Sequence, residues 1–444
     1  MIKMAYIPIG VPTFDLEAAQ IQFDDSVKVL REISEDVLVP EKPLLTLNDL
    51  KAYLGSISPD FIVLQNLTFA NSAYAQMVVQ HINCPVILWT LKEPVVDGTR
   101  LRLNSLTGAY SAANLFHQMG RTDFQYVIGS PKEEEVKKTL NAAYKAAEMK
   151  YKLKSLQVAS IGHTPQGFGF GSALDSDLAR VFGSTLHFVE ARELMDKARK
   201  MKDEDATHEK NESERKMKNI QLLPEENVLS HHKLYKAYKD YIEANGIKAI
   251  ASRCWPDYFV DYGTPVCGVL GLLNDNNIAA ACEADIYGAV TMYIGMELSE
   301  QPVFFGDPVS LNAEENSITY WHCGTAACSL AREDLGPETG VHPNRKIGPT
   351  MEFGCKPCEE VTIFRVGRKP DGSFRFFIAN GEALDKPKQF YGTSVVVKTK
   401  QNAKQIVENS VQEGWEPHFA VIYKDVKQEL EMLAKLLKIE ICNY

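Results

Sequence analysis

Hydrophobic and polar positions in the first third of the chain alternate between short apolar runs and longer amphipathic stretches such as residues 133–149. Four apolar runs have the length and composition of strands, and they lie at residues 4–9, 61–64, 85–89 and 124–128. A regular succession of strand and helix is typical of a parallel sheet covered by helices. The charged helix that begins at residue 133 ends near residue 153, and we place a domain boundary there.

The same rhythm restarts beyond that boundary, with strands expected at residues 156–161, 185–189 and 247–252. From about residue 299 the pattern changes to short alternating pieces between Gly and Pro turns, which indicates antiparallel β structure. These pieces lie at residues 317–321, 360–365, 374–378 and 394–397, and a helix at 425–437 and a short last strand follow them.

The predicted fold class is therefore α/β, with two doubly wound parallel-sheet domains and a β-rich, barrel-like C-terminal domain. The predicted domains are residues 1–153, 154–298 and 299–444, and the second domain ends with a pair of acids described below. A length of 444 residues suits two or three domains. Between residues 195 and 227 a very polar segment of mixed charge predicts a solvated helical face or a mobile arm.

Composition narrows the class of protein. The chain is 45% hydrophobic and 24% charged, and no apolar run approaches the roughly 20 residues that a membrane helix needs. A net charge of −10 disfavours nucleic acid as a partner. The start of the chain enters a strand pattern directly, so we expect a cytoplasmic protein. Nine scattered cysteines indicate reduced thiols, and the CKPC pair Cys355 and Cys358 suits two ordinary cysteines in a turn.

Two carboxylates in the stretch ACEADIYGAV are the first candidates for chemistry. Glu283 and Asp285 follow the apolar run 278–282 directly, so we expect them to emerge at the end of a buried strand, beside a cleft. Two acids in such a place repel each other and are costly to desolvate unless a cation compensates them. The pattern therefore suggests a metal site. Which of the two acids faces the metal stays open.

Further metal ligands are expected from the β-rich part of the chain. Asp307 follows an aromatic strand, His322 lies in ITYWHCG, and His418 lies just before a strand in EPHFAV. Together with the acids they form a plausible O/N site for Mn²⁺ or a similar divalent ion. Cys323 would favour zinc, but neighbouring strand residues face opposite ways, so we set it aside. His342 has the pattern of a loop residue.

The glycine-rich stretch HTPQGFGFG, residues 163–171, follows a predicted strand. Its spacing matches neither GxGxxG nor the P-loop. A loop that lines a substrate cleft at the carboxyl end of a strand is the better interpretation, because ligands of open α/β sheets bind at that edge.

Several of these stretches together resemble the L-fucose isomerase and L-arabinose isomerase superfamily, in particular its shorter branch. The resemblance covers nearly the whole chain and is carried by ACEADIYGAVTM, ITYWHCGTAA and PHFAVIYKDVKQELEMLAKLLKIEI, with support from GVPTFDLEAA, LKEPVVDGTRLRLNSLTG and SIGHTPQGFGFG. It implies a homo-oligomer, a trimer or hexamer, in which a neighbouring subunit's first domain covers a Mn²⁺ site. It also implies metal ligation by Glu283, Asp307, His322 and His418.

The resemblance implies an aldose–ketose isomerase that acts on a monosaccharide through a cis-enediol. Glu283 and Asp307 are the expected acid/base pair, and Asp285 is the third candidate. Where fucose isomerases carry an N-terminal arginine this chain has Val11, and no acid stands near Cys267, where their first acidic ligand falls. Those departures argue against L-fucose as the substrate.

Substrate contacts are expected from Trp255 and from the GTRLRLN cluster of Arg100, Arg102 and Asn104. The arginines suit an anionic sugar tail, which makes a 6-sulfo sugar such as sulfoquinovose a candidate; surface or intersubunit salt bridges are the other possibility. Two other functions also stay open. A non-catalytic sugar-binding protein would need no stoichiometric metal, and a metal-dependent sugar aldolase would release carbon–carbon cleavage products.

Overall fold

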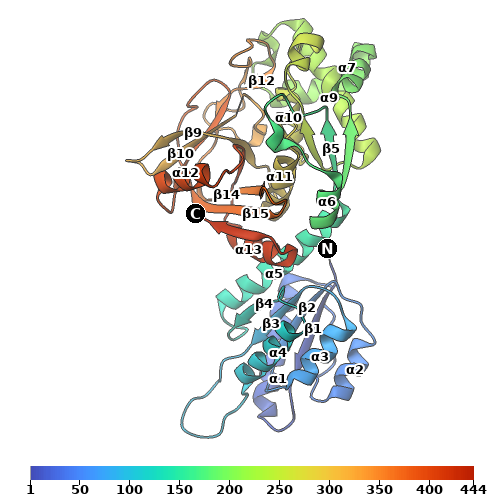
Figure 1. The fold of residues 1–444 in the computed structure, drawn as a ribbon, viewed down its shortest axis with the longest axis vertical. Coiled ribbons are helices and arrows are strands. Elements are labelled where there is room, and N and C mark those ends of the chain that lie inside the picture. Colours follow the sequence, from blue (N-terminus) through green and yellow to red (C-terminus); the bar gives the residue numbers. More distant parts are fainter. Residues whose placement is uncertain (1) are drawn as a thin grey trace. The chain divides into compact units, whose positions relative to one another are not determined.

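A computed structural model describes residues 2–444, which divide into two compact units (Figure 1). The first unit extends to Tyr151 and includes Gln428–Lys438, and the second comprises Lys152–Lys427 and Ile439–Tyr444. The division into three domains at residues 153 and 298 stays a prediction. The mixed α/β class and the two parallel sheets are confirmed.

The first unit contains a parallel sheet with the strand order β1-β2-β3-β4. An extended segment continues this sheet beyond β1: the amide of Leu38 donates to Met4 O at 2.8 Å, and the amide of Leu44 donates to Pro8 O at 2.9 Å. After β1 the chain first adds this segment on one side of β1 and then adds β2, β3 and β4 on the other side. Such an order is doubly wound. The strands are β1 (Met4–Ile9), β2 (Phe61–Asn66), β3 (Val86–Thr90) and β4 (Gln125–Ile128).

Helices accompany this sheet in chain order. Their starts follow local sequence signals: the side chains of Asp15, Thr46 and Asn71 each accept a hydrogen bond from a first-turn amide of the helix that follows. Gln125 Nε2 donates to Met432 O at 3.1 Å and so ties a C-terminal helix to this unit. The helices are α1 (Leu16–Ile33), α2 (Leu47–Leu54), α3 (Ser72–His81), α4 (Ser105–Gln118), α5 (Glu134–Ser155) and α13 (Lys427–Leu437).

The second unit begins with another parallel sheet, in the doubly wound order β6-β5-β7-β8. Short side chains line its last strand, and that strand is buried on both faces. Its strands are β5 (Gln157–Ile161), β6 (Thr185–Val189), β7 (Ala249–Ser252) and β8 (Ala279–Ala281). Its α-helices are α6 (Asp175–Val181), α7 (Ala191–Lys200), α8 (Thr207–Lys216), α9 (Glu225–Asn245), α10 (Cys267–Asp275) and α11 (Ile286–Ser299). It also contains the short 3-10 helices η1 (Gly169–Gly171), η2 (Asp203–Ala206) and η3 (Ile220–Leu222) and the short π-helix η4 (Tyr258–Tyr262).

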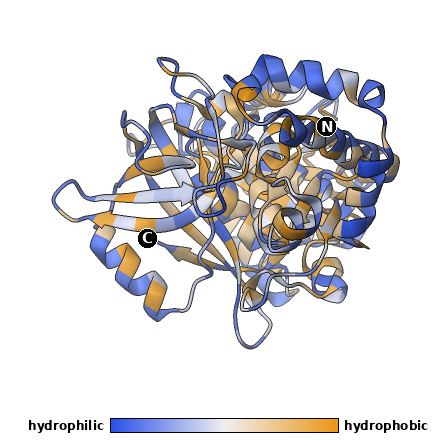
Figure 2. Cartoon of the chain, turned by 90° about the horizontal axis from the view of Figure 1, so that it is seen from above, coloured by the Kyte–Doolittle hydropathy of each residue, from blue (hydrophilic) through white to orange (hydrophobic). Residues whose placement is uncertain are grey.

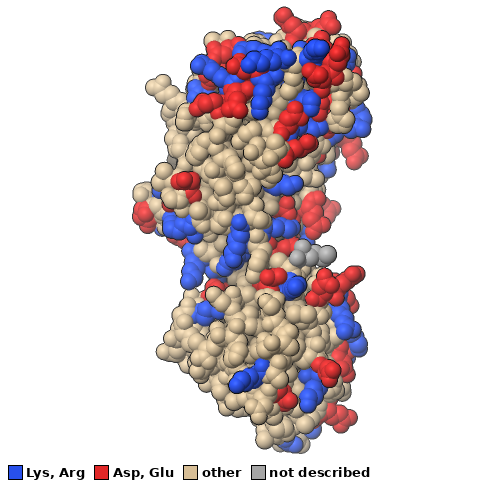
Figure 3. Space-filling view, turned by 90° about the vertical axis from the view of Figure 1, so that its right-hand side faces the viewer, with Lys and Arg blue, Asp and Glu red and all other residues tan. Residues whose placement is uncertain are grey.

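The charged segment 195–227 is mainly helical, in α7 and α8. Figure 3 shows Lys/Arg and Asp/Glu side chains intermingled over the end of the second unit that carries α7 and α9 in Figure 1. Part of this charge is anchored on α9, where Lys239 Nζ lies 3.1 Å from Glu209 Oε1 and 3.5 Å from Glu212 Oε2. The segment is therefore a solvated helical face rather than an arm.

Apart from β11 and β12, which pair with each other, the remaining strands form an eight-stranded mixed sheet that closes on itself. The neighbours run β16-β10-β9-β17-β14-β15, and β15 pairs again with β16, so six strands complete a barrel. This confirms the barrel-like C-terminal part. The elements are β9 (Phe304–Asn312), β10 (Ser317–His322), β11 (Thr339–Gly340), β12 (Thr350–Met351), β13 (Phe353–Gly354), β14 (Cys358–Arg368), β15 (Phe374–Ala383), β16 (Thr393–Thr399), β17 (Phe419–Ile422), β18 (Glu440–Asn443), η5 (Cys328–Leu330) and α12 (Ala403–Gln412).

Helix α11 joins the parallel sheet to the barrel within the second unit. All but one of its 14 residues are buried, and it packs against β7, β8, β14 and β17. Figure 2 shows hydrophobic residues gathered on the inner strands and helices and hydrophilic residues on the outer ones. Within residues 2–444 no helix combines the length and apolar character needed to cross a membrane. The turn before α11 carries the acids of ACEADIYGAV.

Candidate active site

Side chains from four separate segments of the second unit meet at the start of α11. Glu283 and Asp285 come from the turn between β8 and α11, and Asp307 lies in β9. His322 ends β10, and His418 immediately precedes β17. Because β9 pairs with both β10 and β17, the barrel register places the last three side chains beside one another.

Asp285 is fully buried, and its neighbours use both of its carboxylate oxygens. Arg365 Nη1 donates to Oδ2 at 2.6 Å and Nη2 donates to Oδ1 at 3.0 Å, and the Gly288 amide caps Oδ1 at 2.8 Å. Burial opposes the charge, but Arg365 and His418 together hold the pKa of Asp285 well below its usual range. Asp285 is thus an ionised anchor at the N-terminus of α11.

His418 is held between Asp285 and two further carboxylates. Its Nδ1 lies 2.9 Å from Asp285 Oδ2, and an ionised carboxylate only accepts, so Nδ1 carries a proton. The other nitrogen, Nε2, lies 3.1 Å from Glu283 Oε2 and 3.5 Å from Asp307 Oδ1. Burial disfavours the charged ring, yet hydrogen bonds with Asp285 and Glu283 raise the pKa of His418 to about 10. The space around Nε2 therefore attracts a cation.

Glu283 owes its orientation to an unusual backbone. Both Glu283 and Ala284 adopt left-handed φ angles, 59° and 55°, which are uncommon for residues other than glycine and concentrate at functional sites. The turn points Glu283 toward His418 while Asp285 enters the core. Trp255 Nε1 donates to Glu283 Oε1 at 3.3 Å, so one carboxylate oxygen is held and the other faces His418.

His322 completes a set of metal-binding donors. Its ring centroid lies 5.6 Å from that of His418, and its buried Nε2 has no hydrogen-bond partner among residues 2–444. Glu283, His322 and His418 each offer one ligand atom, and these three atoms lie within 4.8 Å of one another. Burial raises the pKa of Asp307, which borders the same space. An orphaned imidazole nitrogen beside carboxylate oxygens fits a divalent cation that accepts mixed O/N ligands.

The glycine-rich loop packs directly over this group. The Phe170 ring centroid lies 5.3 Å from that of His418, and the Phe168 centroid lies 5.7 Å from that of Trp255. A Cβ atom on Gly171 would lie 2.9 Å from the Cα of Asp285, so only glycine permits this approach. The loop follows β5 at the carboxyl edge of the sheet, and its aromatic rings cover one side of the site.

The structure brings together Glu283, Asp285, Asp307, His322 and His418, which the sequence nominated from separate segments, and it adds Trp255 beside Glu283. The other expected substrate contacts belong to the first unit. There Arg100 Nη2 donates to Thr13 O, Arg102 Nη1 lies 3.6 Å from Asp15 Oδ2, and Asn104 is the N-cap residue of α4, with a φ of 53°.

Arg365 is the main site residue that sequence reasoning missed. It lies in the apolar strand β14, and its side chain is fully buried. A single arginine inside an apolar run was the available signal, because a buried charge requires a partner. For Phe168 and Phe170 the sequence predicted only that their loop, residues 163–171, lines a substrate cleft.

Comparisons with known proteins agree with this geometry. The family described as "L-fucose isomerase, C-terminal domain" matches residues 322–444. The chain is 58% identical over 438 residues to a sulfoquinovose isomerase of Clostridium sp. (strain MSTE9), with 99% of this chain and 98% of the relative covered. A sulfoquinovose isomerase of Alkalicoccus urumqiensis is 35% identical, with 99% of this chain and 99% of the relative covered. A sulfoquinovose isomerase of Priestia aryabhattai is 36% identical, with 98% of this chain and 97% of the relative covered. The chain therefore belongs to the sulfoquinovose isomerase family of L-fucose isomerase-like aldose–ketose isomerases.

Proposed function

We propose that the protein interconverts sulfoquinovose, a 6-sulfo aldose, and the corresponding 2-ketose. The observation that carries this proposal is the full-length similarity to sulfoquinovose isomerases, the first of them 58% identical. The convergence of Glu283, His322 and His418 supports it, because an isomerase of this kind needs a carboxylate base next to a cation site. A sugar-binding protein or an aldolase finds no support among these relatives.

Proton transfer in this proposal belongs to Glu283 and Asp307. One carboxylate removes the proton from C2 of the sugar, which leaves a cis-enediol. A carboxyl group then delivers a proton to C1. Trp255 holds one oxygen of Glu283 at 3.3 Å, and the other, 3.1 Å from His418 Nε2, faces the space that the substrate would enter. Burial raises the pKa of Asp307, which favours a carboxyl group that can also donate a proton.

Asp285 takes a different part in the proposal, as a positioning residue. Both of its oxygens are bound by Arg365, Gly288 and His418, so no lone pair is left for the sugar. Its bond to Nδ1 keeps a proton on that nitrogen, so Nε2 is the nitrogen of His418 that gives up its proton when a cation binds in the site. In this proposal Glu283 transfers the proton and Asp285 positions His418.

Glu283, His322 and His418, with Asp307 at their edge, would hold the divalent ion, for which we propose Mn²⁺. Carboxylate oxygens and imidazole nitrogens are ligands that Mn²⁺ accepts. When bound, such an ion supplies Lewis-acid polarisation of the sugar oxygens. The protein's own residues contribute the base, its orientation and the aromatic cover of Phe170.

Deuterium exchange at C2 tests the function directly. Protein loaded with Mn²⁺ in D₂O should replace the C2 proton of sulfoquinovose and form the ketose, and a chelator should stop both until Mn²⁺ is restored. Glu283→Gln keeps the shape of the side chain and removes the base, so we expect a loss of about 10²- to 10⁴-fold. Glu314→Gln, on an exposed turn, is the matched control. Absence of exchange from sulfoquinovose with intact metal loading would overturn the proposal.

A further inference from the structure

Four buried cysteines gather in the second unit beside the candidate active site. Cys254 follows β7, Cys267 begins α10, Cys282 follows β8, and Cys323 follows β10, and all four are free thiols. The thiol of Cys282 contacts the thiols of the other three. Cys267 Sγ lies 3.8 Å from Cys323 Sγ, so Cys267, Cys282 and Cys323 form a triangle of sulfur atoms in mutual contact.

The separation of Cys267 and Cys323 matches an edge of a metal-centred tetrahedron. With a Zn–S bond of about 2.3 Å, the edge between two sulfur ligands of a tetrahedral site is about 3.8 Å. The observed separation of Cys267 and Cys323 equals that edge. Cys267 is also the first residue of α10, where the helix dipole favours an anionic sulfur.

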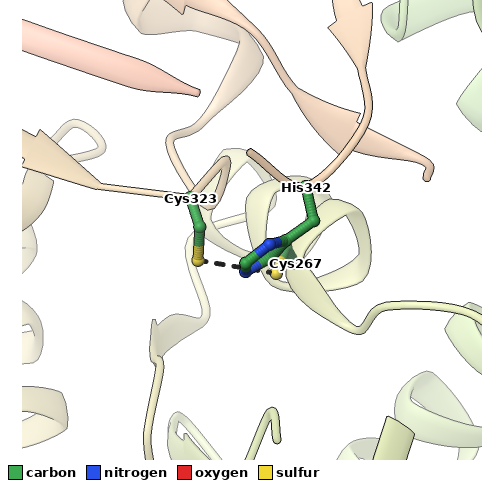
Figure 4. Close-up of side chains that lie close together, drawn as sticks. All are labelled: Cys267, Cys323 and His342. Atoms are coloured by element: carbon green, nitrogen blue, oxygen red, sulfur yellow. Dashed lines mark hydrogen bonds between the residues drawn. The ribbon is translucent and has the colours of Figure 1, made fainter. Parts of the chain in front are cut away.

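His342 supplies a third donor, beside Cys267 and Cys323, from the loop before β12. Figure 4 shows its ring turned toward the sulfur atoms of Cys267 and Cys323, and ligand atoms of these three residues lie within 4.8 Å of one another. The ring packs on Phe259 with centroids 4.9 Å apart, which fixes its plane. Its Nδ1 accepts two long contacts of 3.3 Å from the amides of Asn344 and Arg345. Ligation through Nε2 moves the ring proton to Nδ1 and gives up those two contacts.

We propose that Cys267, Cys323 and His342 form a second metal site, which takes Zn²⁺, with the thiol of Cys282 beside it. Thiolate ligands select Zn²⁺, whereas the carboxylate and imidazole ligands near Glu283 suit harder ions such as Mn²⁺. On binding, the thiols of Cys267 and Cys323 release their protons to solvent, so two thiolates and one neutral imidazole hold the ion and water takes its fourth position. Donor chemistry therefore distinguishes the two sites even though they are neighbours.

The second site also bears on the first. Cys323 Sγ lies 3.5 Å from His322 Nδ1, and the Cys323 amide nitrogen lies 2.9 Å from the same atom. A metal that holds Cys323 in place would therefore hold the ring of His322, whose Nε2 faces the candidate active site. Zn²⁺ at the thiol site would act as a structural support for a ligand of the sugar site.

Cobalt substitution tests the proposal with a signal that does not depend on catalysis. Metal-free, fully reduced protein is titrated with Co²⁺, and thiolate ligation gives a charge-transfer band in the near ultraviolet. We expect the band to saturate with one thiolate-bound Co²⁺ per chain and to disappear when Zn²⁺ displaces the Co²⁺. It should be lost in Cys267→Ser and weakened in His342→Gln, a change at a partly exposed residue.

Two variants separate this site from its neighbours. Cys254→Ser removes a buried thiol that contacts Cys282 from outside the triangle, so the band should persist. Glu283→Gln removes a ligand of the sugar site and should leave the band unchanged. Absence of the band from wild-type protein with all nine thiols reduced would overturn the proposal, as would a band that survives Cys267→Ser. A disulfide between Cys267 and Cys323 in protein purified without reductant, in place of bound Zn²⁺, would overturn it equally.

Discussion

Asp285 and Arg365 form a fully buried, bidentate ion pair directly behind His418. Eighty residues separate them in the chain, and both side chains have no exposed surface. The pair holds a negative charge against Nδ1 of His418. It therefore connects the stability of the barrel to the orientation of a ring in the candidate active site.

Asp285→Asn should destabilise the fold and reduce activity together. The change leaves Arg365 as a buried charge without its partner, and breaking such a pair costs about 3–5 kcal/mol. Loss of the carboxylate behind His418 should lower kcat by about 10- to 100-fold. Denaturant unfolding and steady-state kinetics measure the two effects. The double variant Asp285→Asn, Arg365→Met removes both charges, so it should regain stability but not activity; full activity in either variant would contradict the positioning role.

Gly171→Ala should impair catalysis through the approach of the glycine-rich loop. The added Cβ would lie 2.9 Å from Asp285 Cα and 3.1 Å from Ala284 O, and backbone atoms cannot move aside easily. We expect kcat/KM to fall at least about tenfold, because small displacements of a site are amplified in the rate. Gly169→Ala is the matched control, since nothing lies within 4 Å of its Cβ position. Equal activities of the two variants would show that the loop does not support the site.

Arg100→Ala tests whether the first unit recognises the anionic end of the substrate. We propose that Arg100, Arg102 and Asn104 reach the pocket of a neighbouring subunit in a trimer or hexamer. Loss of a charged hydrogen bond to a sulfonate should raise KM for sulfoquinovose by about 10- to 100-fold. Lys51→Ala, an exposed residue on α2, serves as the control. Analytical ultracentrifugation measures the oligomeric state. An unchanged KM would mean that these arginines form salt bridges and do not bind the substrate.

Acid should destabilise the second unit through His231. Burial, with His232 as a neighbouring charge, lowers the pKa of His231 to about 3, and neither ring nitrogen has a hydrogen-bond partner within residues 2–444. Between about pH 6.5 and 3 the unfolded chain binds a proton that the folded state excludes, so stability falls as pH falls, by about 1.4 kcal/mol per unit.

His231→Leu removes this proton uptake and should flatten the pH dependence of the unfolding free energy by that amount over the same window. Urea unfolding at a series of pH values gives the slopes. His208→Leu, at a side chain that is 77% exposed, should leave the slope as in the wild type. An unchanged slope in His231→Leu would mean that His231 is already protonated in the folded protein.

Local patterns predicted much of the backbone. The strands expected at 4–9 and 185–189 match β1 and β6 residue for residue, and most others differ only at their ends. These predictions depend on the periodicity of side chains along one segment, which neighbouring residues determine. Bridges made by single residues, such as Leu38 and Leu44 beside β1, carry no periodic signal, so the full strand order was visible only in the fold.

The roles of the two acids in ACEADIYGAV could not be predicted from their spacing. Their positions after an apolar run indicated a site, but strand alternation and a helix start would each have oriented them differently. The left-handed angles at Glu283 and Ala284 direct one carboxylate to His418 and the other to Arg365. That choice depends on partners 80 and 135 residues away.

The sequence by itself determined the alternation of strands and helices, the residue types available for chemistry and the apolar run that precedes Glu283. Only the tertiary structure decided which of these residues meet. Arg365 reaches Asp285, His322 and His418 reach Glu283, and four cysteines from separate segments share one cluster, because strand register and helix packing join positions that are far apart in the chain. Local sequence sets backbone conformation, whereas a site needs side chains brought together across the whole core.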